Sequence, residues 1–233
     1  NQARFNISQR ISFYEDEMPV LQYIQTEIQK QREHYLEKFC ISSGDLKLFV
    51  DPAGKSVNFY YKDQLITKGY GLFSGLKIDS RPYSLSFCKD WNVIKKDVNT
   101  MRLVMTQEKC RQEEIFVFRL NAKGLSVKVG IISPVNFKLE AYYFKLEFNE
   151  NYKIWETSYE RSNFPSEAQT IESIMPARMI ENKVDSIIMR SEEKVLPILN
   201  ISTFFNPSRR IASLHKRREK ETETICLQYQ FSF

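Results

Sequence analysis

The sequence has little of three residue types on which many enzymes depend. It contains 2 histidines, 4 cysteines and 7 glycines among 233 residues. The two histidines, His34 and His215, lie far apart in the chain, so a Ser–His–Asp triad or a histidine metal cluster has almost no material. The cysteines form no C-x-x-C pair, and we interpret them as buried apolar groups. We therefore expect no metal and no cofactor.

Glycine is too sparse to form the usual phosphate-binding loops. The spacing in Gly69-Tyr70-Gly71…Gly75 does not match the dinucleotide fingerprint. The residues that follow, Leu72–Ile78, are typical of a strand rather than of the helix that such a loop requires. We interpret the glycines as a bend between two strands.

The sequence also lacks a long apolar run and a broadly basic composition. No apolar run approaches the roughly 20 residues that a membrane-spanning helix needs. The net charge is +5, and residues 209–221 carry six basic and two acidic residues, an excess of four that leaves the remainder nearly neutral. This excludes a body-wide basic surface for nucleic acid. We interpret the basic segment as a solvated connection or a charge-protected edge strand. The alternative is a segment that contacts phosphate, an acidic glycan or an anionic membrane surface.

The chain begins at Asn1 with no charged-then-apolar leader. This beginning indicates a mature or excised fragment. The sequence does not indicate a cellular compartment.

What the sequence has in abundance is alternation of apolar and polar residues. Ile225, Leu227, Tyr229, Phe231 and Phe233 share one face near the end, and the same period of two recurs in residues 125–131 and 57–61. This period is typical of half-buried antiparallel strands. Apolar residues make up 42% of the chain and aromatic residues 13%, which is enough for a substantial core.

Turn signals separate several of these strands. Asp51-Pro52-Ala53-Gly54 predicts a hairpin between Leu46–Val50 and Lys55–Tyr61, and Asn121-Ala122-Lys123-Gly124 predicts a second turn. In Phe137–Phe148 the apolar residues change face halfway, which indicates a bulge or a strand buried on both sides. Further strands are expected near residues 65–67, 72–78, 83–87, 91–95, 100–106, 115–120, 125–132, 152–156, 184–189 and 195–201.

One segment has helical periodicity instead. Between Asp16 and Cys40 an apolar stripe recurs at steps of three and four, formed by Met18, Leu21, Ile24, Ile28, Tyr35, Leu36 and Phe39. Asp16 is suited to the N-cap and Pro19 to the first turn. We expect the stripe to pack on the outer face of a sheet or on a neighbouring domain.

These patterns predict an all-β fold with an N-terminal amphipathic helix. We expect residues 1–44 to form a lead-in and the helix, and residues 45–233 to form one large antiparallel two-sheet β-sandwich.

A candidate binding segment runs from Trp155 to Pro165. Its aromatic and polar residues lie at a strand-to-loop transition, and aromatic faces stack on sugar rings while charged groups bond hydroxyls. The candidate ligand-binding residues are Trp155, Tyr159, Glu160 and Arg161. The alternative is that the aromatic residues of this segment anchor the loop to the core.

The order of elements resembles the β-supersandwich of the galactose-mutarotase-like superfamily. The resemblance rests on the hairpin 46–61, the glycine bend 68–78, the long strands through Trp91 and Phe148, the 155–165 turn and the segment Val195-Leu196-Pro197-Ile198-Leu199. It implies a domain of a carbohydrate-active protein. The catalytic histidine of the superfamily's epimerases cannot be carried over, because neither histidine lies in a central strand.

The resemblance implies a noncatalytic, polysaccharide-recognising or architectural module of a larger polysaccharide-processing protein, with carbohydrate and other domains of that protein as partners. One alternative is a glycoside hydrolase or polysaccharide lyase that uses carboxylates or a Tyr/Arg pair. For Glu140 and Glu147, two of the available carboxylates, alternation predicts a solvated face. The other alternative is a structural or protein-interaction domain that docks through its helix, which an exposed helical stripe would favour.

Overall fold

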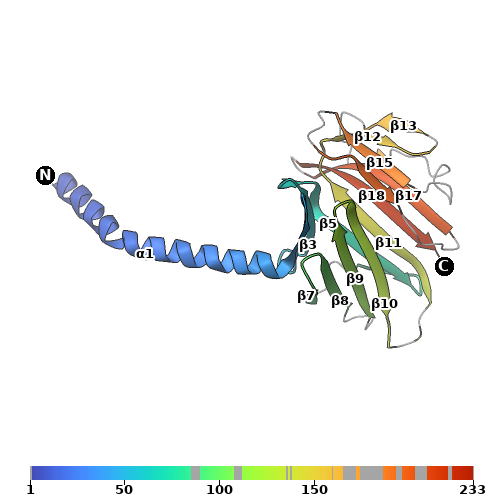
Figure 1. Cartoon of the computed structure of the whole chain (residues 1–233), viewed down its shortest axis with the longest axis horizontal. Helices are drawn as coiled ribbons and strands as arrows, with labels where there is room; N and C mark the ends of the chain where they lie inside the picture. Colours follow the sequence, from blue (N-terminus) through green and yellow to red (C-terminus); the bar gives the residue numbers. More distant parts are fainter. Residues whose placement is uncertain are drawn as a thin grey trace. The chain divides into compact units, whose positions relative to one another are not determined.

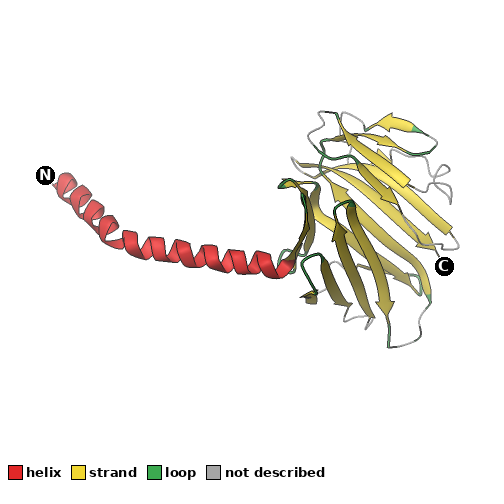
Figure 2. Ribbon diagram, viewed as in Figure 1, coloured by secondary structure: helices red, strands yellow, loops and turns green. Residues whose placement is uncertain are grey.

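The computed structural model describes residues 2–84, 90–107, 112–134, 136, 138–158, 160–164, 172–173, 186–192, 196–202, 209–219 and 222–232. The chain forms two compact units, Asn1–Phe39 and Cys40–Phe233. The first unit is helical, and the described part of the second consists of strands and short connections (Figure 2).

The first unit is one long helix, α1 (Gln2–Phe39). The predicted helix is confirmed, but its predicted start is wrong, because α1 begins at Gln2 rather than near Asp16. Pro19 consequently lies inside the helix, where it cannot donate a backbone hydrogen bond and favours a bend. The helix is bent along its length in Figure 1. On its exposed surface, Lys30 pairs with Glu27 at 2.8 Å and Gln29 donates to Glu33 at 2.8 Å.

The described part of the second unit contains 18 strands in four antiparallel sheets. The first sheet has the order β1 (Cys40–Ser43), β2 (Leu46–Asp51), β3 (Ser56–Tyr61), β4 (Gln64–Leu65). The second has the order β10 (Gly124–Ile132), β9 (Gln112–Asn121), β8 (Thr100–Gln107), β7 (Asp90–Lys95). Both predicted turns, 51–54 and 121–124, are confirmed in these sheets.

The third sheet has six strands, in the order β14 (Glu172–Ser173), β17 (Arg209–Glu219), β18 (Thr222–Ser232), β11 (Leu139–Phe148), β5 (Thr67–Ile78), β6 (Arg81–Ser84). The fourth has the order β13 (Arg161–Asn163), β12 (Tyr152–Glu156), β15 (Ser186–Ser191), β16 (Leu199–Ser202). The basic segment is therefore a strand rather than a connection: β17 pairs along its whole length with β18.

The prediction of a mainly β fold with one N-terminal helix is confirmed, whereas the two-sheet sandwich is wrong. The described residues form four small sheets, in an arrangement more like the blades of a four-bladed β-propeller. Alternation shows which face of a strand is buried but not which strands pair. The central pairing joins distant residues, because Leu146 of β11 lies between Leu72 of β5 and Leu227 of β18.

Side chains from all four sheets contribute to the core. The largest fully buried ones are Ile41, Leu48, Ile66, Leu76, Met101, Leu103, Phe116, Phe118, Tyr152 and Trp155. The second and third sheets meet where Phe116 of β9 contacts Phe144 of β11, with ring centroids 6.5 Å apart. The register shifts of β11 lie near its ends, between Leu139 and Ala141 and between Leu146 and Phe148, and the pairing is regular across the change of apolar face. Adjacent Ala141 and Tyr142 are both buried there, which fits the alternative of a strand buried on both sides.

The described cysteines fit the expected apolar role in part. Cys226 is buried and Cys40 is half-buried. Burial raises the pKa of the Cys40 thiol. Cys88 and Cys110 lie outside the described residues.

Candidate functional site

The described members of the predicted carbohydrate-binding set, Trp155, Glu160 and Arg161, belong to one hairpin, formed by β12 and β13. Trp155 lies on β12 opposite Ser162, and Glu156 lies opposite Arg161. The intervening turn is closed by hydrogen bonds between Thr157 and Glu160: the Thr157 N–H donates to the Glu160 carbonyl at 2.8 Å, and the Glu160 N–H donates to Thr157 Oγ1 at 3.1 Å. The sequence therefore identified a real turn.

The hairpin does not present these residues on one surface. Trp155 is 1% exposed, so both faces of its indole ring are packed in the core. Arg161 is exposed and Glu160 is half-buried, while Tyr159 lies outside the described residues. Burial of Trp155 fits the anchoring alternative for this residue, because a buried ring cannot stack on a sugar. The carbohydrate-binding hypothesis for the hairpin stays a prediction, and among its described residues it rests on Glu160 and Arg161.

That prediction can be tested at Arg161. If the turn binds a polysaccharide, Arg161→Ala is expected to weaken binding about 10-fold, because a lost hydrogen bond from a charged group costs about 1.4 kcal/mol or more. The measurement is a glycan array followed by calorimetric titration of any polysaccharide that binds. Arg119→Ala is the matched control, since Arg119 is also exposed and lies on β9 of another sheet. Equal affinity of the two variants would contradict a role for the turn.

A cluster of buried polar groups joins the second sheet to the third. Glu114 of β9 is fully buried and accepts hydrogen bonds from Ser74 Oγ of β5 at 2.6 Å and from Tyr142 Oη of β11 at 2.5 Å. Burial raises the pKa of the Glu114 carboxyl to about 7, and the two hydrogen bonds oppose that shift. Gln112, also buried on β9, has no hydrogen-bond partner for its Oε1 among the described residues.

A carboxyl group that titrates near neutrality has the chemistry of a general acid or base. Glu114 has no exposed surface, however, so no substrate can reach it in this structure. The cluster therefore acts on stability rather than on a ligand. Sequence reasoning missed it, although the period of two that buries Phe116 and Phe118, continued backwards, also places Glu114 and Gln112 on the inner face.

The predicted glycine bend lies within β5 rather than between two strands. Gly69 and Gly71 have φ angles of +60° and +69°. The Tyr70 N–H between them donates to Glu147 Oε2 at 3.0 Å, and Glu147 is buried. The expectation of a solvated face for Glu147 is therefore wrong, since its carboxylate closes the bend.

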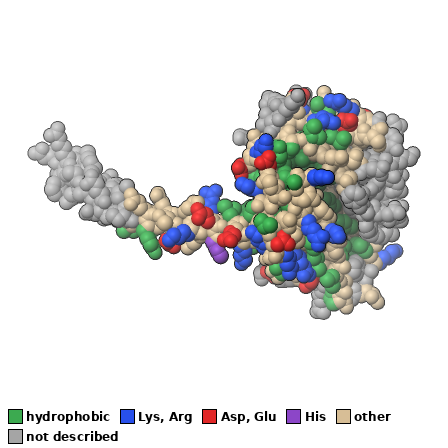
Figure 3. Space-filling view, viewed as in Figure 1, with side chains coloured by type: hydrophobic (Ala, Val, Ile, Leu, Met, Phe, Trp, Pro, Cys, Tyr) green, Lys and Arg blue, Asp and Glu red, His purple; other side chains and the backbone are tan. Residues whose placement is uncertain are grey.

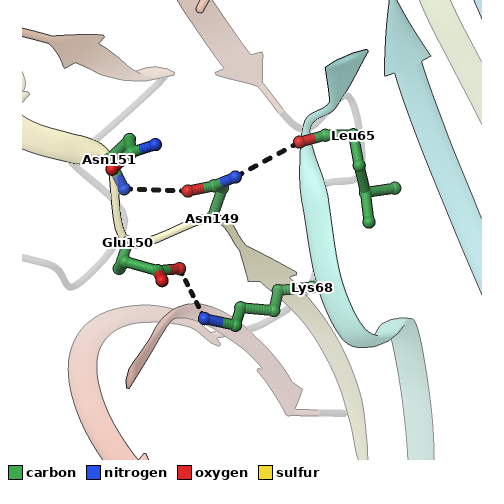
Figure 4. A network of polar contacts seen from close by, with 5 residues as sticks. All are labelled: Leu65, Lys68, Asn149, Glu150 and Asn151. Atoms are coloured by element: carbon green, nitrogen blue, oxygen red, sulfur yellow. Dashed lines mark hydrogen bonds and ion pairs between the residues drawn. The ribbon is translucent and has the colours of Figure 1, made fainter. Parts of the chain in front are cut away.

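A second polar network holds the same region, where β11 turns into β12 (Figure 4). Lys68 Nζ lies 2.6 Å from Glu150 Oε2. Asn149 Nδ2 donates to the Leu65 carbonyl at 3.4 Å, and the Asn151 N–H donates to Asn149 Oδ1 at 3.0 Å. These contacts satisfy one another, which indicates a structural role for the glycine bend rather than phosphate binding.

Among the described residues, no group of three or more His, Cys, Asp and Glu side chains is arranged to hold a metal ion. His34 is exposed on α1, and the side chain of His215 on β17 lies outside the description. No described helix combines the length and hydropathy needed to cross a bilayer.

Helix α1 carries the main concentration of exposed apolar side chains. Six large ones between Val20 and Leu36 are 41% to 66% exposed: Val20, Leu21, Tyr23, Ile24, Ile28 and Leu36. Leu21, Ile24 and Ile28 belong to the stripe predicted from the sequence. Figure 3 shows apolar side chains at the surface of the described part of the helix, among charged ones. The stripe is therefore a candidate interaction surface.

The chain matches no protein-family model and no curated protein.

Proposed function

We propose that this chain is a protein-interaction module that assembles through helix α1. The observation that carries the proposal is the exposure of Leu21, Ile24 and Ile28 along one side of the helix. Single exposed apolar residues are ordinary on protein surfaces, but a contiguous row of them is typical of an interaction site.

The energetics favour a covered helix. Fully burying a Leu or Ile side chain contributes about 1.5–3 kcal/mol relative to leaving it in water. An isolated helix gains little from propensity alone, and its stability in proteins comes mostly from packing of an apolar face. Three large aliphatic side chains left in water would therefore forgo several kcal/mol that a partner can supply.

The spacing of the row favours another helix as the partner. On the same side of the helix, a seam with alternating steps of four and three residues runs from Leu21 through Gln25, Ile28 and Arg32 to Tyr35. A repeat that averages 3.5 residues keeps one seam facing a second helix in a left-handed coiled coil. Ile24 and Leu36 flank this seam and widen it, whereas Tyr23 lies on the opposite side.

The proposal is tested by photo-crosslinking in the full-length chain. A benzoylphenylalanine at position 28 is expected to crosslink to the assembled partner, and one at position 30, on the opposite face, is not. Adding Leu21→Gln and Ile24→Gln is expected to abolish the crosslink at position 28, because glutamine keeps helix propensity but removes the apolar row.

The matched control is Thr26→Gln with Glu37→Gln, which changes the opposite face and leaves the row intact. Crosslinking at position 28 that survives the Leu21/Ile24 change would contradict the proposal. Equal yields from positions 28 and 30 would do the same.

A further inference from the structure

We infer that the outer face of the second sheet binds a soluble ligand that carries a phosphate monoester or diphosphate group. The residues that carry the inference are Arg102 of β8, Arg119 of β9 and Lys128 of β10. They lie on a different unit of the chain from α1, so this inference does not depend on the proposed function.

The register of the sheet brings the three cations together on one face. Alternation along β9 buries Phe116 and turns Val117 and Arg119 outward. Arg102 lies opposite Val117 on one side, and Lys128 lies opposite Val117 on the other. Both are therefore diagonal neighbours of Arg119. Diagonal neighbours in a sheet lie about 7–8 Å apart, which is within the reach of long side chains, so the three charged groups can contact one small ligand.

These charges have no counter-charge in the described part of the chain. Arg119 and Lys128 are exposed and Arg102 is half-buried. Among the described residues, none of the three forms an ion pair or a side-chain hydrogen bond. Like charges held close together on a sheet repel one another, so the cluster costs stability that a bound anion would restore.

The turns at the same end of the sheet add to the positive potential. Lys96 lies between β7 and β8, and Lys123 lies between β9 and β10; both are exposed. The acidic residue of these described turns is Asp97, whose carboxylate accepts a hydrogen bond from the Asn99 N–H at 2.9 Å. Cations therefore outnumber carboxylates at this end of the sheet. Figure 3 shows Lys and Arg side chains on the part of the surface where Figure 1 draws β8, β9 and β10.

The charge and donors of the cluster favour phosphate over a single carboxylate. A phosphate monoester carries about −1.5 to −2 charges at neutral pH and three strong acceptor oxygens, whereas a carboxylate carries one charge. Arginine binds phosphate oxygens in a bidentate manner, and lysine contributes a point charge. Ser126, which lies directly opposite Arg119 and is exposed, offers a hydroxyl donor beside them.

The rest of the same face favours a small soluble ligand over an extended one. The outward positions of the described sheet include no aromatic residue, so a single-stranded nucleic acid would find no stacking platform there. The other end of the face carries Glu113 of β9 and Asp90 of β7, both paired with Thr106 of β8. A flat anionic membrane would meet these carboxylates together with the cations, whereas a small ligand contacts the cationic end alone.

The experiment is a calorimetric titration of the full-length chain with pyrophosphate at low ionic strength. The wild type is expected to bind pyrophosphate more tightly than acetate. Arg102→Gln with Lys128→Gln is expected to weaken pyrophosphate binding about 10-fold or more, because two charge-assisted contacts are lost. The unfolding temperature of this ligand-free variant is expected to be no lower than that of the wild type, because the change relieves repulsion.

The matched control is Arg81→Gln with Lys138→Gln, which removes the same net charge from exposed positions next to the third sheet. It is expected to keep the wild-type affinity for pyrophosphate. Equal losses in the two double variants, or no pyrophosphate binding by the wild type, would overturn the site. Tighter binding of poly-glutamate than of pyrophosphate would assign an acidic protein partner instead. Binding to phosphatidylserine vesicles that excess pyrophosphate does not displace would overturn the soluble ligand.

Discussion

Replacing Gly71 with alanine is expected to lower the free energy of unfolding by more than about 3 kcal/mol, among the largest effects of a single substitution. Gly71 has a φ angle of +69°, a conformation that costs residues with a Cβ about 1–2 kcal/mol. A Cβ built at this position would also overlap the Val57 carbonyl oxygen of β3, at 1.8 Å. The overlap is with backbone, so relief requires β3 and β5 to move apart. Thermal and denaturant unfolding of the full-length chain measure the effect.

Gly44→Ala is the control that separates the two contributions. Gly44 has a similar φ of +58°, but a Cβ there would meet nothing within 4 Å. We expect Gly44→Ala to cost about 1 kcal/mol, from conformation alone. Equal losses of stability for the two variants would contradict a contribution from the close approach of β3 and β5 to the cost of Gly71→Ala.

The second large effect is a fall in stability between about pH 4.5 and pH 7 that depends on Glu114. In the unfolded chain the Glu114 carboxyl titrates near 4.5, whereas burial raises its pKa to about 7 in the folded protein. Below pH 4.5 the group is protonated in both states and imposes no penalty. As the pH rises toward 7, the unfolded chain releases this proton and the folded chain retains it, so folding becomes less favourable. A shift of this size corresponds to roughly 3 kcal/mol.

Glu114→Gln isolates this contribution, because glutamine has the same shape and does not titrate. We expect the difference in unfolding free energy between the wild type and this variant to change by roughly 3 kcal/mol from pH 4.5 to pH 8. Taking the difference between the two proteins cancels the pH-dependent contributions that both share. One of these, of opposite sign, comes from Glu140, whose pKa is lowered by a hydrogen bond from Lys77. Tyr142→Phe removes one donor and is expected to raise the pKa of Glu114 further, moving the loss to higher pH. Parallel pH profiles for the wild type and Glu114→Gln would contradict the account.

Local patterns predicted local structure well. The turns at 51–54 and 121–124 follow from proline and glycine positions, which are short-range features. The number of sheets did not follow, because β11 pairs with both β5 and β18 through contacts between residues far apart in sequence. The start of α1 was also misplaced, since Pro19 was assigned to a first turn although it lies in the helix interior.

The candidate sites show the same limit, namely that local sequence patterns do not reveal which distant residues pack together. Composition selected Trp155 as an aromatic ligand-binding residue, but whether an aromatic side chain faces solvent or the core depends on the packing around its strand, and Trp155 is buried. Conversely, the Glu114 cluster requires three strands to meet, and no local pattern in β5, β9 and β11 joins Ser74, Glu114 and Tyr142. The exposed helical stripe could be predicted from the sequence, because periodicity defines the face of a helix without reference to distant residues.

The carbohydrate-associated role expected from the resemblance to the galactose-mutarotase-like superfamily remains a prediction, as does a glycosidase or lyase activity. The proposed interaction function differs from them because it rests on exposed apolar side chains of α1, an element that the structure describes. It is compatible with a larger parent protein, since a domain that assembles through one helix can hold other domains together.

The most direct test of the central claim is a photo-crosslinking scan along α1, with one probe at each position from 20 to 39. The account predicts that the yield follows the seam, with maxima at positions 21, 25, 28, 32 and 35 and minima at positions such as 26, 30, 33 and 37 on the other face. A yield that does not vary with position, or one with its maxima on the face containing Thr26 and Lys30, would contradict assembly through the apolar row.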